Sequence, residues 1–388
     1  MGIDLPFLIS DLRWGATLSH VQTAQSMNPL PLHEFHHTLG AQFGEVNGTE
    51  VVARYGEPVA EYTALQQTAG VLDLSHRSRI CLTGVDRARF LHGQVTNDVN
   101  RLRTGEGCYA AITTAKGKME SDLNIYALAD ELLLDFEPGL TEKITGRLEK
   151  FLVADDVQIV EVAALYGLLS VQGPKANDVI KALGIFAELP AKPFQSVKVS
   201  DSMLGEIYLI AIDRTAFSGF DLFVPTDSLG AVVDKLIAAA KSIGGRACGW
   251  DALEIARIEA GIPRYGADMD ESNIPLECGI EARAISYQKG CYIGQEVINR
   301  IHSIGHVNKE LRCLRLEGAA SVVPTKGDKF FHDGKEAGYL TSAAKSPVTD
   351  AILALGYVRR EALKADAFTL QSAAGEIKIT LNASPLPS

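Results

Sequence analysis

The chain has 388 residues, of which 46% are hydrophobic and 22% charged, values that are ordinary for a globular protein and that exclude a disordered, collagen-like or coiled-coil chain. Its length predicts two or three domains. The formal charge is −11, and residues 1–284 carry the acidic excess, with 24 basic and 38 acidic side chains against 13 and 10 in residues 285–388. An acidic body argues against nucleic acid as a partner, because phosphate backbones are bound by clustered Lys and Arg.

The sequence also lacks the segments that carry a chain into or across a membrane. Its longest apolar runs fall far short of the roughly 18 residues that a spanning helix needs. The first residues carry Asp4 and no Lys or Arg before Arg13, whereas a signal peptide begins with a basic region. We therefore expect a cytoplasmic protein with no membrane partner.

The hydrophobic pattern predicts two α+β units followed by an all-β segment. Residues 1–30 show no sustained period and are expected to form an extension, and residues 33–40 a short helix. In the first unit we expect strands at 79–83, 108–114, 121–128, 132–136 and 157–162, with helices at 86–92 and 140–152. In the second unit we expect strands at 168–172, 196–199, 207–212 and 220–224, with helices at 174–183, 228–242 and 250–260. From about residue 311, short strands between glycine-containing turns predict a small β-barrel or sandwich.

Six cysteines are spread along the chain, and no two are closer than 13 residues. This spacing excludes a structural zinc site built on Cys-x-x-Cys pairs and a small disulfide scaffold. We expect most of the six to be buried free thiols.

The most unusual segment is residues 289–296, with the sequence Lys-Gly-Cys-Tyr-Ile-Gly-Gln-Glu. Its two glycines keep the backbone open to close approach by a ligand. Lys289 would favour the thiolate of Cys291 if the two side chains lie within a few Å. The alternative is a turn that leads into a helix at Glu296 with Cys291 buried, and the residues alone leave both possibilities open.

Two aspartates and two histidines are further candidates. Asp98 follows the end of a predicted helix, and Asp221 lies on a strand where it would project away from the core-facing Phe220 and Leu222. An aspartate in such a place usually caps a turn or faces solvent. Residues 302 and 306 are histidines at a metal-capable spacing, but no carboxylate accompanies them at a zincin position, so no metal site is predicted.

These segments together resemble the folate-binding GcvT/YgfZ superfamily over about residues 32–383. The superfamily contains the aminomethyltransferases of the glycine cleavage system and the YgfZ-like proteins of iron–sulfur cluster maintenance. The matching landmarks are residues 70–76, 94–99, 171–174, 256–266 and 289–296. The last of these agrees at every position with the YgfZ-like signature K-G-C-[FY]-x-G-Q-E.

The resemblance implies an α+β fold in which two ferredoxin-like units and a C-terminal β-barrel form a three-domain ring, with folate in the central channel. After the extension of residues 1–30, a discontinuous folate-binding domain would combine residues 31–76 with 158–284. It would enclose an inserted α+β domain at 77–157. Residues 285–388 would form a linker and the barrel, whose basic excess would suit the carboxylate tail of a folate.

The resemblance also implies the ligand and its site. The cofactor would be tetrahydrofolate or a one-carbon derivative, and no metal is expected. Asp98 would lie near the reactive nitrogens, where a carboxylate stabilises developing positive charge. Asp221 aligns with a glutamate that accepts a donor pair from the pterin. The full expectation is that the catalytic residues are Asp98 and Cys291, and that the cofactor-binding residues are Asp98, Asp221, Arg257, Tyr109 and Lys289.

Three departures from the aminomethyltransferase pattern favour the YgfZ-like branch. The segment around Asp221 is three residues shorter, Leu253-Glu254 replaces part of an Ala-Arg-Asp step, and Cys291 stands where those enzymes usually have phenylalanine. We therefore expect a tetrahydrofolate-binding protein that supports assembly or repair of iron–sulfur proteins, with only indirect effects on tRNA modification. The alternative is a folate-dependent aminomethyl- or methyltransferase, and whether any reaction is catalysed stays open.

Overall fold

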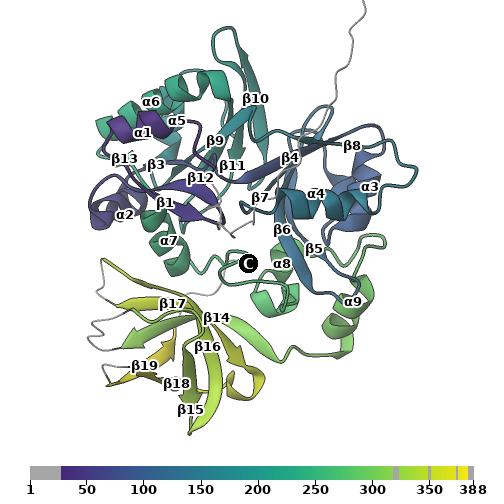
Figure 1. The fold of residues 1–388 in the computed structure, drawn as a ribbon, viewed down its shortest axis with the longest axis vertical. Helices are drawn as coiled ribbons and strands as arrows, with labels where there is room; N and C mark the ends of the chain where they lie inside the picture. Colours follow the sequence, from purple (N-terminus) through teal and green to yellow (C-terminus); the bar gives the residue numbers. More distant parts are fainter. Residues whose placement is uncertain (1–27, 318–322, 348–350, 373–374, 383–388) are drawn as a thin grey trace, which may run out of the picture.

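The computed structural model describes residues 28–317, 323–347, 351–372 and 375–382 (Figure 1). Within them are two open sheets, a two-stranded hairpin and a closed six-stranded barrel. Figure 1 shows the two open sheets next to each other and the barrel, in yellow and light green, below them. The expected α+β fold with a C-terminal β-barrel is confirmed.

The first sheet has six strands with helices on both faces. Its strands in spatial order are β10 (Ser196–Asp201), β11 (Gly205–Ala211), β12 (Gly219–Pro225), β9 (Tyr166–Gln172), β3 (Gly70–Asp73) and β13 (Arg246–Ala247). One face packs on α5 (Ala176–Ala182) and α6 (Thr226–Ser242). The other face packs on α2 (Pro58–Gln67) and α7 (Trp250–Glu259). The stripe of apolar residues on α6 is buried as its spacing predicts, because it covers the sheet.

A short helix and a hairpin lie beside this sheet. The helix is α1 (His33–Thr38), and the hairpin joins β1 (Gln42–Val46) to β2 (Thr49–Arg54). Leu30 is buried and Asn28 pairs with Thr49. The last residues of the predicted extension therefore belong to the fold, and residues 1–27 lie outside the described part of the chain.

The second sheet has five strands, covered on one face by two helices. Its strands in spatial order are β5 (Gly107–Thr113), β6 (Met119–Ala127), β7 (Leu132–Phe136), β4 (Ser78–Thr83) and β8 (Gln158–Glu161). The helices are α3 (Arg87–Gln94) and α4 (Thr141–Glu149), and the 3₁₀ turn η1 (Val99–Arg101) follows α3. Helix α3 continues through Gly93, where the sequence predicts its end.

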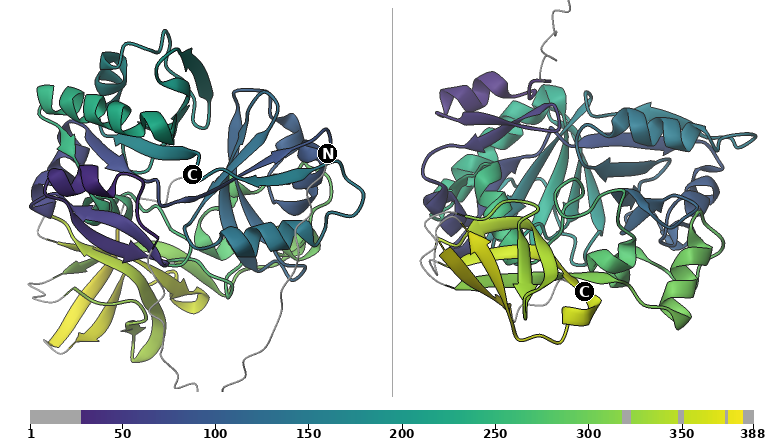
Figure 2. Two further views of the ribbon diagram at one scale, coloured as in Figure 1. Left: turned by 45° about the horizontal axis from the view of Figure 1, so that its top comes forward. Right: turned by 60° about the horizontal axis from the view of Figure 1, so that its bottom comes forward.

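A helical connection leads to the barrel. It contains η2 (Pro275–Cys278), α8 (Glu281–Ala284) and α9 (Gln295–Ile304). The barrel strands, in order around the barrel, are β14 (Lys309–Glu317), β17 (Ile352–Arg359), β16 (Lys335–Lys345), β15 (Lys329–His332), β18 (Ala367–Ser372) and β19 (Gly375–Leu381). The turn η3 (Arg360–Ala362) follows β17. Helix α7 packs against β16 and β17 of the barrel. Both views in Figure 2 show the barrel, in yellow and light green, beside the half of the molecule that contains the first sheet.

Arg79 holds together the two places where the chain crosses between the open sheets. Its side chain is fully buried at the start of β4. Its guanidinium donates hydrogen bonds to the carbonyls of Ser75 (3.1 Å) and Arg77 (2.9 Å) in the first crossing. It also donates to those of Ala163 (3.2 Å) and Tyr166 (2.9 Å) in the second. One side chain thus satisfies four backbone acceptors that secondary structure leaves unpaired.

We expect Arg79→Met to lower the free energy of unfolding by about 3–5 kcal/mol, because it leaves several buried carbonyls without a donor. Urea unfolding followed by circular dichroism measures this loss. Arg89→Met is the matched control, since Arg89 forms only exposed ion pairs and its loss should cost less than about 1 kcal/mol. Equal effects of the two substitutions would show that Arg79 is not the link between the crossings.

Candidate functional site

A narrow cavity of about 120 Å³ lies where the two sheets, α7 and α8 meet. Its walls carry three aromatic side chains, Tyr109, Phe194 and Trp250. They also carry five arginines and four carboxylates: Arg77, Arg214, Arg257, Arg264, Arg283, Asp122, Glu137, Asp213 and Glu254. This combination of flat apolar surfaces and many charges suits a ligand that has both an aromatic ring and ionic groups.

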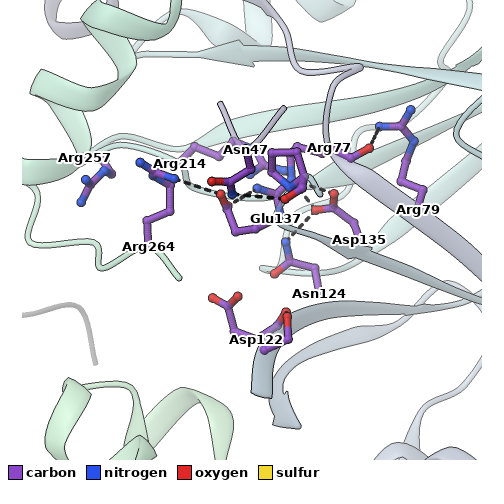
Figure 3. A network of polar contacts seen from close by, with 12 residues as sticks. Asn47, Arg77, Arg79, Asp122, Asn124, Asp135, Glu137, Arg214, Arg257 and Arg264 are labelled. Atoms are coloured by element: carbon purple, nitrogen blue, oxygen red, sulfur yellow. Dashed lines mark hydrogen bonds and ion pairs between the residues drawn. The ribbon is translucent and has the colours of Figure 1, made fainter. Parts of the chain in front are cut away.

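Most of these charges form one continuous series of ion pairs, which we call the ion-pair chain; Figure 3 shows its middle part, with Arg214, Asp135, Arg77, Glu137 and Arg264. It alternates acid and arginine through nine side chains: Asp221, Arg214, Asp135, Arg77, Glu137, Arg264, Glu254, Arg257 and Asp268. Its links range from 2.5 Å between Arg214 and Asp221 to 3.3 Å between Arg214 and Asp135. Each acid is neutralised by a neighbouring arginine, so a buried array of charges of this size is tolerated between the sheets.

The ion-pair chain lowers the pKa of two of its carboxyl groups, Asp135 and Glu254. Burial opposes ionisation of Asp135, but Arg77 and Arg214 together hold the pKa of that carboxyl below its ordinary value. Burial likewise opposes ionisation of Glu254, and Arg257 and Arg264 hold its pKa low. These carboxylates stay ionised at neutral pH and are committed to their arginines.

The far end of the ion-pair chain reaches the barrel. Arg257 donates a hydrogen bond to the hydroxyl of Ser342 on β16 (3.0 Å). Asp268 accepts one from Thr341 on the same strand (2.6 Å). The ion-pair chain begins at Asp221 on β12, so it connects the first sheet to the second sheet, to α7 and to the barrel.

Three charged residues of the cavity wall lie outside the ion-pair chain: Asp122, Asp213 and Arg283. Asp122 on β6 accepts a hydrogen bond from the hydroxyl of Tyr109 (2.8 Å), and Figure 3 shows it apart from the arginines. Arg283 lies 5.2 Å from the centre of the Tyr109 ring. Among the described residues, no side chain of opposite charge lies within ion-pair distance of any of the three, and the Nε of Arg283 has no hydrogen-bond acceptor. Within the described residues, the cavity wall therefore offers two acids without an ion pair, Asp122 and Asp213, and one base without an ion pair, Arg283.

The residues expected to bind the cofactor lie in two places. Tyr109 and Arg257 line the cavity. Asp221 faces away from the core, as its position predicts, but it is fully buried behind the cavity and Arg214 donates three hydrogen bonds to it. Arg214 therefore takes the place at Asp221 that the resemblance gave to the pterin.

Asp98, Lys289 and Cys291 are not among the side chains that line the cavity. The carboxylate of Asp98 pairs with Arg101 (3.0 Å), and its other oxygen lies 3.3 Å from Nδ1 of His92 without forming a hydrogen bond. Cys291 is exposed, so the buried thiol of the alternative is wrong, whereas its turn into a helix is present, because α9 begins at Gln295. A β-carbon added at the neighbouring Gly290 would lie 3.4 Å from Nε2 of His92. These residues form a second polar region, at the end of α3.

Lys289 caps the C-terminus of helix α3. Its ammonium donates hydrogen bonds to the carbonyls of His92 (2.6 Å), Val95 (2.6 Å) and Asn97 (2.8 Å). Carbonyls at a helix C-terminus lack partners within the helix and attract a cation. Burial lowers the pKa of Lys289 to about 8. The ammonium therefore binds backbone oxygens, whereas the sequence led us to consider it as a partner of the Cys291 thiol.

No metal site accompanies these regions within the part of the chain that the structure describes. His302 lies on α9, where it stacks on Tyr287 with ring centres 3.8 Å apart and pairs with Glu281 (2.8 Å). His306 lies beyond the end of the helix. All six cysteines are free, four of them buried, as their spacing predicts. No helix of the described residues is long and apolar enough to cross a membrane.

Eight of the nine charged residues of the cavity wall were not predicted as site residues: Arg77, Asp122, Glu137, Asp213, Arg214, Glu254, Arg264 and Arg283. The only signal for them is that Arg77 and Arg264 adjoin or lie within two landmark segments, residues 70–76 and 256–266. The barrel, whose basic excess would suit the carboxylate tail of a folate, contributes no arginine to this cavity wall, since all five arginines of the wall precede residue 285.

The unpaired Asp122 should reduce stability at neutral pH. Burial raises its pKa to about 6, with a further contribution from Glu137, so the folded protein binds this proton more tightly than the unfolded chain does. Stability then falls as the pH rises from about 4, the ordinary pKa of aspartate, to about 6. We expect Asp122→Asn to stabilise the protein by about 1–2 kcal/mol above pH 6, a figure reduced for the side that faces the cavity, and not below pH ~4.

Thermal unfolding of the two proteins between pH 3.5 and 8 measures this difference. Asp234→Asn is the matched control, because Asp234 is exposed on α6. A pH-independent effect of Asp122→Asn would contradict the raised pKa.

Comparison with known proteins assigns the chain to a family. Residues 32–289 match the GCVT N-terminal domain and residues 309–386 match the glycine cleavage T-protein C-terminal barrel domain. An aminomethyltransferase of Rubrobacter xylanophilus is 28% identical over 333 residues, which are 85% of this chain and 87% of that protein. One of Staphylococcus saprophyticus is 26% identical over 343 residues, 88% and 93% of the two chains.

A solved structure has the same fold. The glycine cleavage system aminomethyltransferase T of Bartonella henselae superposes with a TM-score of 0.83 at 22% sequence identity, covering 93% of this chain and 98% of that one. The matches to the N-terminal domain and to the barrel domain follow one another in the same order as the two open sheets and the barrel. The chain therefore belongs to the family of proteins built from a GCVT N-terminal domain and a glycine cleavage T-protein C-terminal barrel.

Proposed function

We propose that the protein binds tetrahydrofolate or a one-carbon derivative in the central cavity and acts as a folate-dependent aminomethyltransferase. The observation that carries the proposal is the position of the cavity. It lies between the two open sheets of a chain whose relatives, named aminomethyltransferases, align with 85–88% of its length. This support places the transferase ahead of the YgfZ-like function that the sequence favours.

The chemistry of the wall suits a folate. Tyr109, Phe194 and Trp250 offer flat faces for a pterin or aminobenzoyl ring, and Trp250 is held in place by the guanidinium of Arg264, 5.0 Å from its ring centre. The unpaired Arg283 is a natural partner for a carboxylate of the glutamate tail. The cavity volume is below the roughly 300–1,000 Å³ of typical ligand pockets, so binding requires side chains of the wall to move.

The protein supplies position and charge, whereas the folate supplies the nucleophilic nitrogens that accept the one-carbon unit. The ion-pair chain holds the pKa of Glu254 low and binds Glu137 between two arginines, and so gives the cavity a fixed pattern of charge before the ligand arrives. The aromatic walls exclude water from the reacting amine, which slows hydrolysis of the one-carbon unit. Asp98 and Cys291, the predicted catalytic residues, and Lys289, a predicted ligand, remain predictions.

We expect Arg283→Gln to weaken tetrahydrofolate binding by about 10- to 100-fold, because a charged hydrogen bond to the ligand tail is lost. Isothermal titration calorimetry under anaerobic conditions measures the affinity. Arg300→Gln is the control, since Arg300 is exposed on α9. Unchanged affinity in Arg283→Gln, with binding to the unmutated protein intact, would place the tail elsewhere.

The transferase activity is tested by the formation of methylene-tetrahydrofolate from an aminomethylated H-protein. We expect turnover by the unmutated protein and its loss in Asp98→Asn if Asp98 acts in the reaction. A protein that binds tetrahydrofolate but produces no methylene-tetrahydrofolate from this donor would contradict the transferase assignment.

A second candidate function is support of iron–sulfur cluster assembly or repair by a YgfZ-like folate-binding protein. It is favoured by the exposure of Cys291, since an accessible thiol can react with a partner protein. Its partners would be iron–sulfur proteins or their assembly machinery. Cys291→Ala should then fail to complement a YgfZ-deficient strain, whereas Cys313→Ala, which removes a buried barrel thiol, should complement it if the variant folds. Full complementation by Cys291→Ala would remove this role of the thiol.

A further inference from the structure

We propose that a second cavity between the two open sheets binds a small organic ammonium ion that carries an apolar group. This second cavity has a volume of about 300 Å³, and none of the residues that line it also lines the central cavity. The proposal does not depend on the proposed function, because it concerns a different part of the space between the sheets.

The second cavity lies further along the strands that end at the central cavity. Arg77, just before β4, lines the central cavity, whereas Arg79 on that strand lines the second one. Glu137, just after β7, lines the central cavity, whereas Leu133 near the start of β7 lines the second one. The two cavities therefore lie at opposite ends of the same sheet-to-sheet contact.

Three aromatic side chains of the first sheet form one wall of the second cavity: Tyr166, Tyr208 and Phe223. Tyr208 on β11 is the cross-strand partner of Phe223 on β12. Tyr166 on β9 is the partner of Pro225, two residues after Phe223, so alternation places all three rings on one face of the sheet. The rings of Tyr166 and Tyr208 lie edge to face with their centres 6.4 Å apart. Aromatic faces such as these attract cations.

The rest of the second cavity is largely apolar and reaches the surface. Its other side chains from the second sheet and from the crossing after β8 include Cys81, Leu128, Leu133, Val160, Val162 and Leu165. Val160 is 39% exposed and Leu165 is 60% exposed. Exposed apolar side chains around a cavity are typical of a binding site, and they favour a ligand with an apolar group.

Glu131 is the charge that the second cavity offers to a ligand. It is half-buried in the turn before β7, and among the described residues no basic side chain lies within ion-pair distance of it. Its charge acts on both tyrosines of the aromatic wall: burial raises the phenol pKa of Tyr166 and of Tyr208 most, followed by Glu206 and then Glu131. An ammonium ion at Glu131 would therefore also lie near aromatic rings, the surroundings that organic cations prefer.

The two basic groups near this wall do not take the place of such a ligand. Arg79 is fully buried and donates hydrogen bonds to four backbone carbonyls, so its charge is not presented to a ligand even though its Nε has no acceptor. Lys198 lies 6.0 Å from the centre of the Tyr208 ring, but its ammonium pairs with Glu206 (2.9 Å). The accessible charge of the cavity is the carboxylate of Glu131, which favours a cation over an anion.

The test uses 2-phenylethylammonium as the probe, with the neutral analogue 2-phenylethanol and the anionic analogue 3-phenylpropionate for comparison. Isothermal titration calorimetry of the full chain at pH 7 measures the three affinities. We expect the ammonium to bind about tenfold or more tightly than either analogue, because only the ammonium forms a charged hydrogen bond to Glu131. Tighter binding of 3-phenylpropionate would identify Arg79 as the recognising charge and would overturn the proposal.

Variants then locate the site. Glu131→Gln should weaken binding of 2-phenylethylammonium by about 10- to 100-fold, and Tyr166→Leu by about 3- to 10-fold through loss of an aromatic face. Asp130→Asn is the matched control, because Asp130 is the neighbouring acid of the same turn, is exposed and does not line the cavity. It should change the affinity by less than about twofold.

Thermal unfolding of each variant without the probe establishes that the variant is folded. Unchanged affinity in a folded Glu131→Gln variant would place the ammonium elsewhere and overturn the proposal. Absence of binding by the folded, unmutated protein would overturn it as well. Neither result bears on tetrahydrofolate, whose binding is measured separately.

Discussion

The ion-pair chain is the interaction on which the rest of the structure depends. It begins on the first sheet at Asp221, passes through Asp135 on the second, and ends at Asp268, where Thr341 of the barrel is bound. Removing one member leaves an uncompensated buried charge, which costs more than the whole pair contributes. The same series forms the wall of the cavity. The ion pairs that connect the two open sheets and the barrel therefore also set the charge pattern of the cavity.

The sequence predicts most strands and helices because their evidence is local. Strand β7 was expected at 132–136, where it lies, and α6 within two residues of its start, since alternation and helical spacing are visible in single segments. The hairpin β1–β2 and strand β3 were missed. Strand β3 is only four residues long, and its place between β9 and β13 depends on pairing with segments about 100 and 175 residues away. The domain boundaries remain a prediction.

The site was less predictable than the fold, since its chemistry arises from pairs that no local pattern reveals. The face of Asp221 follows from strand alternation, yet its partner Arg214 lies on the turn after β11. Asp122 was overlooked because a single aspartate on a strand has no motif. It differs from Asp135 only in what lies opposite, which is a phenol for Asp122 and two guanidinium groups for Asp135. Fold-level resemblance located the region but not these partners.

The turn at residues 96–98 connects the cavity wall to the second polar region, which contains Lys289 and Cys291. The amide of Asn97 donates hydrogen bonds to the carbonyls of Tyr109 (2.8 Å) and Arg283 (2.9 Å), both of which line the cavity. The carbonyl of the same residue accepts a hydrogen bond from Lys289, two residues before Cys291. One asparagine therefore connects the backbone of the cavity wall to Lys289, so the two regions are held in a fixed relation.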